Sequence, residues 1–139
     1  MDLKKIVACG VIGGIWLLMM TFISSSAAGL VAPYNMAEIG GMRSIDDPIM
    51  FLFFGYPFVL AFMASLVFAL TGSAIRGTVI NRGITFGLVL LMLVTIPNQF
   101  VIYTSMTYPL GFFISNILAG LIGFPVLGII IAAVFERTI

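Results

Sequence analysis

The 53-residue stretch GITFGLVLLMLVTIPNQFVIYTSMTYPLGFFISNILAGLIGFPVLGIIIAAVF (residues 83–135) contains no charged residue. A helix needs about 20 mainly apolar residues to cross a hydrocarbon core of about 30 Å, so this stretch is too long for one helix. A natural break lies at residues 104–108, where small polar residues precede Pro109, a residue that suits the first turn of a helix. We therefore predict two membrane spans, at residues 83–103 and 109–135.

Two further uncharged gaps hold one span each. One gap of 32 residues separates Lys5 from Glu38, and another of 28 residues separates Asp47 from Arg76. They predict spans over residues 6–32 and 48–71, the first being longer than the apolar core of a usual secretory signal. The fold class predicted is an all-α integral membrane protein, with residues 1–139 forming a single domain, a four-transmembrane-helix bundle.

The composition agrees with a membrane location. Of the 139 residues, 62% are hydrophobic and 8% are charged, too few charges to cover a soluble globule. We therefore expect the lipid bilayer to be the main partner. The net charge of +1, without a basic patch, argues against nucleic acid. A single cysteine, Cys9, excludes an internal disulfide, and the absence of histidine removes the commonest metal ligand, so we expect no metal and no cofactor.

The basic residues predict the orientation of the chain. Four spans place both termini and the loop at residues 73–82 on one side of the membrane. That side carries five basic residues, against Arg43 alone on the other: Lys4, Lys5, Arg76, Arg82 and Arg137. Because positive residues are enriched in cytoplasmic loops, we expect both termini in the cytoplasm and the protein in the plasma (cytoplasmic) membrane.

Polar side chains from all four predicted spans are expected at one level. At about 1.5 Å per residue, Asn98 lies roughly 22 Å above Gly83 and Asn116 roughly 10 Å below Pro109, so both fall in the half of the membrane away from the termini. Hydroxyl and amide groups of the other spans fall at a similar height. The predicted polar cluster is Ser24, Ser25, Tyr56, Asn98, Gln99, Ser115 and Asn116.

Two interpretations of this polar cluster are open. The side chains could hydrogen-bond to one another across helices and stabilise the bundle, because an amide in hydrocarbon is costly without a partner. Alternatively, they could line a cavity for a small neutral or amphipathic ligand. Helix bends are expected at Pro57, Pro97 and Pro125, and would shape such a cavity.

Small residues predict close helix contacts. Gly10 and Gly14 have the four-residue spacing that lets helices approach closely in lipid, and we expect them to pack within the bundle. The indole N–H of Trp16, near mid-membrane, is expected to find an acceptor on a neighbouring helix. Asp46 and Asp47, directly before Pro48, are explained as the cap of the second helix rather than as a cation site.

The predicted function is that of a small non-catalytic membrane protein, an accessory, structural or interaction subunit. No carboxylate lies inside a predicted span, and a nucleophilic serine would lack an evident base, so we expect no enzyme activity and no catalytic residue. Small-residue helix faces would meet a second copy of the chain or another membrane protein. The alternative is a transporter, channel or lipophilic-ligand-binding protein that uses the polar cluster as its cavity.

Overall fold

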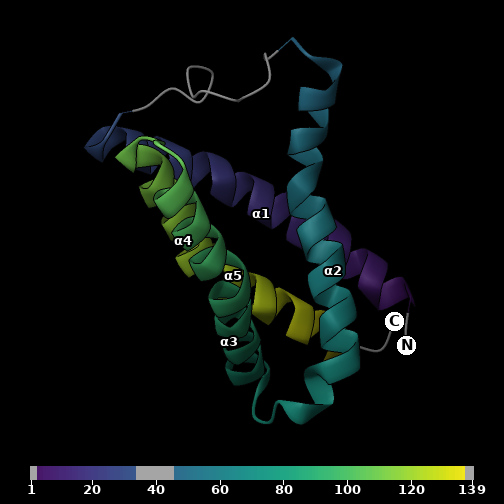
Figure 1. The fold of residues 1–139 in the computed structure, drawn as a ribbon. Helices are drawn as coiled ribbons and strands as arrows, with labels where there is room; N and C mark the ends of the chain where they lie inside the picture. The colour runs from purple at the N-terminus through teal and green to yellow at the C-terminus, as the bar shows by residue number, and fades with distance from the viewer. Residues whose placement is uncertain (1–2, 34–45, 137–139) are drawn as a thin grey trace.

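The computed structural model describes residues 3–33 and 46–136 (Figure 1). The described part of the chain is helical and contains no strand. Its α-helices are α1 (Leu3–Val31), α2 (Tyr56–Thr71), α3 (Val79–Leu90), α4 (Ile96–Ser105) and α5 (Leu110–Glu136). Short 3₁₀ segments η2 (Pro48–Gly55) and η3 (Gly72–Ala74) flank α2, and a π-helical turn, η4 (Leu91–Thr95), joins α3 to α4. Glu38, Arg43 and Arg137, which entered the predictions of spans and orientation, lie outside the described residues.

Within residues 3–33 and 46–136, four helices are long and apolar enough to cross a membrane. They are Leu3–Val31, Tyr56–Ala74, Val79–Ser105 and Leu110–Glu136. Large apolar side chains cover their outward faces: Leu93 is 71% exposed and Phe100 is 68% exposed. Such a surface is stable against acyl chains rather than against water. An all-helical chain with four such helices was the coarse prediction, and the structure confirms it.

The second span begins differently from the continuous helix predicted over residues 48–71. Asp47 caps the 3₁₀ segment η2, since its Oδ1 accepts a hydrogen bond from the Ile49 N–H at 2.9 Å. This contact confirms the predicted capping role of Asp47. The α-helix begins only at Tyr56, with Pro57 in its first turn, where proline's missing N–H is not needed. Pro57 therefore marks the change from 3₁₀ to α geometry.

The third span starts at Val79, earlier than the predicted residue 83. Thr78 provides the cap, because its hydroxyl oxygen accepts a hydrogen bond from the Asn81 N–H at 3.3 Å. Further along, the Ile96 N–H bonds to the carbonyl oxygen of Leu91, five residues earlier. Pro97 has no N–H to continue the ladder, so a π-helical turn stands directly before it.

Glycines allow α3 and α5 to pack backbone against backbone. A Cβ added at Gly87 would meet the Phe124 carbonyl oxygen and the Pro125 Cα. A Cβ added at Gly128 would meet the backbone of Gly83 and Gly87 in turn. Only residues without a side chain permit this distance between two helix axes. The contact places Pro125, inside α5, directly against α3.

Glycines on α1 accept aromatic rings from α2. The rings of Phe62 and Phe58 occupy the space beside Gly10 and Gly14, while Gly13 faces Leu127 of α5. The predicted packing of these glycines within the bundle is confirmed. The helix α1 thus lies between α2 and α5, and α3 lies on the other side of α5. Leu127, Ile131 and Cys9 are fully buried where these helices meet.

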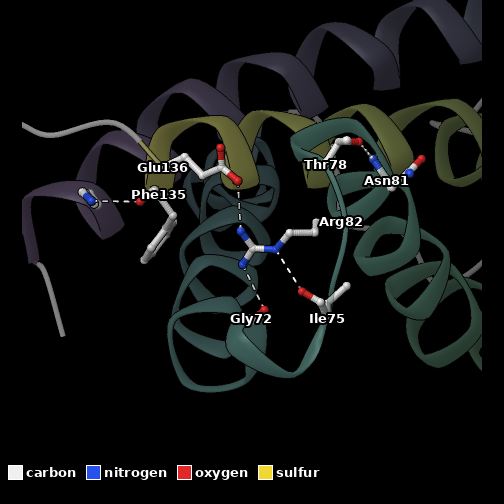
Figure 2. A network of polar contacts seen from close by, with 8 residues as sticks. Gly72, Ile75, Thr78, Asn81, Arg82, Phe135 and Glu136 are labelled. Carbon is white, nitrogen blue, oxygen red and sulfur yellow. Dashed lines mark hydrogen bonds and ion pairs between the residues drawn. The ribbon is translucent and has the colours of Figure 1, made fainter.

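A network around Arg82 joins the connection at residues 72–78 to the end of α5 (Figure 2). Arg82 donates from Nε to the Ile75 carbonyl oxygen at 3.0 Å and from Nη2 to the Gly72 carbonyl oxygen at 2.9 Å. Its Nη1 pairs with Glu136 Oε1 at 3.2 Å. Lys5 Nζ donates to the Phe135 carbonyl oxygen at 2.9 Å, so the start of α1 and the end of α5 lie at this same end of the bundle.

Candidate functional site

A cavity of about 90 Å³ lies among the four spans, toward the end away from Arg82. Every span contributes to its wall: Leu17 and Thr21 from α1, three residues from the start of α2, four from η4 and α4, and four from α5. The apolar part of the wall is formed by Leu17, Pro57, Leu60, Val94, Ala119 and Phe124. Gly120 completes the wall without a side chain.

The polar part of the wall is formed by six side chains: Thr21, Tyr56, Thr95, Asn98, Gln99 and Asn116. Tyr56, Asn98, Gln99 and Asn116 belong to the predicted polar cluster, and the structure brings these four residues to one cavity. At neutral pH, amides, hydroxyls and a phenol carry no charge. The cavity therefore offers hydrogen-bond donors and acceptors without an ionised group.

Gln99 is the most informative of these residues. It is 9% exposed, and it is the buried residue of α4. Its Oε1 atom is buried and has no hydrogen-bond partner among the residues that the structure describes. A buried acceptor without a donor costs about 1–3 kcal/mol relative to a satisfied one. Gln99, a residue of the cavity wall, thus carries an acceptor that no described residue satisfies.

The cavity residues Asn116, Asn98 and Tyr56 differ in how far they are buried. Asn116 is half-buried, and its Nδ2 donates to the Phe112 carbonyl oxygen of its own helix at 2.9 Å. Asn98 and Tyr56 line the cavity and are also exposed, Tyr56 by 53%. With Thr21, which also lines the cavity and is exposed, they lie at its mouth, whereas Gln99 is buried.

The three serines of the predicted cluster do not line the cavity. Ser24 is 1% exposed and Ser115 is 8% exposed, so both are packed between helices. The hydroxyl oxygen of Ser24 has no hydrogen-bond partner within the described part of the chain. Ser25 is half-buried on the adjacent face of α1. The structure thus separates these side chains from the amides that share their level.

Two polar residues of the cavity wall, Thr21 and Thr95, were absent from the predicted polar cluster. Thr21 donates its hydroxyl to the Leu17 carbonyl oxygen, one turn earlier, at 2.8 Å. Thr95 precedes Gln99 by four residues, so the two share a helix face. That spacing was the available signal for Thr95. Threonine is tolerated in apolar helices because its hydroxyl can bond to its own backbone, and it therefore stands out little in the sequence.

The prolines predicted to bend helices take different positions around the cavity. Pro57 lines it, at the first turn of α2. Pro97 is exposed and follows the π-helical turn η4, which contributes Val94 and Thr95 to the wall. Pro125 follows the cavity residue Phe124 and packs on Gly87. Each proline is thus next to a residue of the wall or is part of it.

The search for metal ligands among the described residues finds no group of three or more His, Cys, Asp or Glu side chains. Comparison with known protein families, with curated proteins and with solved structures finds no match. The class of protein therefore follows from the fold itself. It is a helical chain with four helices suited to a membrane, and these helices surround a cavity lined by uncharged polar groups.

Proposed function

We propose that this chain is a small non-catalytic integral membrane protein that binds a small uncharged ligand in the cavity among its four spans. The observation that supports this most is that Gln99 lines the cavity and its buried Oε1 has no donor among the described residues. A purely structural amide would be expected to bond across helices. An amide oxygen that no described residue satisfies therefore supports a role other than joining helices.

The lining favours an uncharged molecule that is polar at one end. Moving a charge into an apolar environment costs many kcal/mol unless it is paired, and the cavity wall has no ionised partner to offer. Apolar residues, Leu60 and Phe124 among them, face the polar groups across the cavity. An amphipathic molecule satisfies both kinds of surface. In the transporter version of this proposal, the same cavity binds the ligand while it crosses the membrane.

Saturation-transfer NMR on the purified protein tests the proposal with four probes of similar size. 1-Butanol and butanamide are neutral, and butyrate and butylammonium are their charged counterparts. We expect saturation transfer from the protein to the neutral probes and not to the charged ones. The transfer should be lost in Gln99→Leu.

The control is Asn81→Leu, which replaces an amide side chain by leucine at an exposed position outside the cavity. It should bind the neutral probes like the wild type in the same detergent, which separates binding to the cavity from partition into micelles. Equal transfer to all four probes, or equal transfer in the wild type and Gln99→Leu, would contradict the proposal.

An accessory or interaction subunit is the second function we propose. In its favour, α4 buries little of its surface: Phe100 and Tyr103 are 68% and 72% exposed and are available to lipid or to another membrane protein. The small-residue faces expected to meet a partner give less support, since Gly10, Gly14 and Gly87 are occupied by contacts within the chain. Cross-linking from Tyr103→Cys to a second membrane protein or copy in native membranes would favour this function.

We further propose that both termini face the cytoplasm and that the membrane is the plasma membrane. The proposal is supported by the gathering of Lys5, Arg76 and Arg82 at one end of the bundle with the described ends of the chain. Basic residues near membrane spans are enriched on the cytoplasmic side.

A further inference from the structure

The exposed polar residues that line the cavity are Thr21, Tyr56 and Asn98, so its mouth is bordered by α1, α2 and α4. Tyr56 at the start of α2 and Asn98 on α4 both line the cavity and remain exposed. Within the described residues, α2 packs mainly on α1, whereas α3 and α4 pack on α5, and α2 has little contact with α4. Figure 1 shows α2 diverging from α3 and α4 with distance from the connection at residues 72–78. The opening is therefore on the side of the bundle.

The opening is close to one membrane surface. Asn98 lies seven residues before the end of α4 at Ser105, and Asn116 lies six residues after the start of α5 at Leu110. At about 1.5 Å per residue, both are about 10 Å from that end of the bundle. The helices Val79–Ser105 and Leu110–Glu136 each have 27 residues. They are about 40 Å long, which matches a bilayer of about 40–45 Å with its headgroups, so the cavity lies just inside the hydrocarbon boundary.

At this depth, the molecules beside a lateral opening are lipids, with their glycerol backbones and first methylene groups. A lipid with a phosphate or an ammonium group would have to leave that charge unpaired inside the cavity. A neutral lipid with a free hydroxyl would not. Its O–H can donate to Gln99 Oε1, the buried acceptor that has no partner in the described chain.

The size of the cavity limits how much of the lipid enters. Pockets for drug-sized molecules measure about 300–1,000 Å³. The cavity measures about 90 Å³ and so accommodates the polar end of a lipid and not its acyl chains. Those chains can remain in the bilayer because the mouth opens sideways. A water-soluble ligand would gain nothing from such an opening.

We propose, on the basis of the proposed function, that the ligand is a neutral membrane lipid with a free hydroxyl, of the diacylglycerol type. It enters from the bilayer between α2 and α4, passes Tyr56 and Asn98, and donates its hydroxyl hydrogen to Gln99 Oε1. The cavity binds the head of the lipid while the acyl chains stay in the membrane.

Native mass spectrometry of the full chain tests this assignment with four probes added separately at equal concentration. They are 1,2-dioctanoylglycerol, its 3-acetyl ester, dioctanoyl phosphatidic acid and glycerol. The ester removes only the hydroxyl donor, the acid adds charge, and glycerol lacks acyl chains. We expect dioctanoylglycerol to bind at least about tenfold more tightly than its acetyl ester, as a lost hydrogen bond to a buried acceptor implies. It should also bind more tightly than the charged phosphatidic acid and than glycerol, which lacks acyl chains.

Two variants locate the binding. In Gln99→Leu, the preference for dioctanoylglycerol over its acetyl ester should fall below about twofold. In Asn98→Leu, which changes an exposed residue at the mouth, binding of dioctanoylglycerol should weaken while the protein stays folded. Asn81→Leu should bind like the wild type. If Gln99→Leu and Asn98→Leu bind all four probes as the wild type does, the assignment is overturned.

The probes also separate this inference from the proposed function. If 1-butanol and butanamide bind at the cavity while dioctanoylglycerol and its ester bind equally, the lipid assignment is wrong and the small-ligand function remains. If glycerol binds as tightly as dioctanoylglycerol, the ligand comes from water and the lateral route is wrong. If no neutral probe binds, both proposals are wrong.

Discussion

The indole N–H of Trp16 on α1 donates a hydrogen bond to the carbonyl oxygen of Gly123 on α5, at 2.9 Å. The expectation that this indole finds an acceptor on a neighbouring helix is thereby confirmed. The acceptor is a backbone carbonyl rather than a polar side chain. Gly123 presents no side chain to the side chains of Leu17 and Met20, so α1 can lie close enough for the bond.

Removing this bond should weaken the contact of α1 with α5. We expect Trp16→Phe to lower the free energy of unfolding by about 0.5–2 kcal/mol, as for other hydrogen bonds between membrane helices. Unfolding in mixed micelles with increasing SDS, followed by circular dichroism, measures the change. The ring of phenylalanine retains part of the packing. A stability equal to that of the wild type would mean that the indole bond contributes nothing.

Glycine-to-alanine substitutions should have graded effects. Gly87→Ala places a methyl group against the backbone at Phe124 and Pro125, which cannot rotate away, and should destabilise by about 1–3 kcal/mol or more. Gly10→Ala meets the side-chain ring of Phe62, which can shift, so its effect should be smaller.

Gly29→Ala is the control for this series, since no heavy atom outside its local backbone lies within 4 Å of its added Cβ. It should be neutral or stabilise α1 by up to about 1 kcal/mol, because alanine favours helix. The same unfolding measurement ranks the three variants. A loss at Gly29 equal to that at Gly87 would contradict the backbone contact of α3 with α5.

Arg82 should stabilise the protein through its two carbonyl contacts more than through its ion pair. The Glu136 side chain is 45% exposed, and exposed ion pairs contribute about 0–1 kcal/mol. Arg82→Lys loses the forked geometry that reaches both Ile75 and Gly72, and should cost about 1–3 kcal/mol. Glu136→Gln should cost less than about 1 kcal/mol.

Hydrogen exchange at residues 72–78 provides the local readout for these variants. Exchange should become faster in Arg82→Lys and change little in Glu136→Gln. A larger effect of Glu136→Gln in both measurements would show that the ion pair is the dominant contact.

Gln99→Leu distinguishes a binding residue from a structural one. Because Gln99 Oε1 is buried without a partner, leucine removes an unsatisfied acceptor and should raise stability by about 1 kcal/mol while ligand binding is lost. Asn98→Leu should weaken binding and leave the fold intact. Thermal unfolding of the purified variants measures the change. If either variant unfolds the protein, the amides hold the bundle together.

The orientation can be measured with single cysteines in a Cys9→Ser background. Ser73 and Thr107 are both exposed and lie at opposite ends of the bundle. With the termini in the cytoplasm, a membrane-impermeant maleimide added to intact cells should label Thr107→Cys and not Ser73→Cys. After the cells are broken, both should react. Labelling of Ser73→Cys in intact cells would reverse the orientation.

Much of the fold could be predicted from the sequence, because hydrocarbon permits few alternatives. Charged residues are costly in hydrocarbon, so the uncharged runs predicted the four helices. Local chemistry was also predictable: Asp47 caps the second span next to Pro48. Thr78 was overlooked as a cap, and the third span therefore begins earlier than expected. A single threonine marks the start of a helix less clearly in a sequence than a long uncharged run marks a membrane span.

The depth of the site residues in the membrane could be predicted, but the direction in which their side chains point could not. The rise along a helix placed Asn98 and Asn116 at one level, and the structure has both at one cavity. It has Ser24 and Ser115 between helices instead. The π-helical turn before Pro97 changes which face of the third span carries Gln99, and that turn was not among the sequence predictions.

By itself, the sequence determined how many helices suit the membrane and which of their residues require a hydrogen-bond partner, since both follow from the cost of polar groups in hydrocarbon. Only the tertiary structure decided that Gly123 satisfies Trp16, that α2 stands apart from α4, and that Gln99 Oε1 lacks a donor. The physical reason is that the depth of a residue follows from its position along one helix. Its partner depends on how several helices rotate and pack against one another.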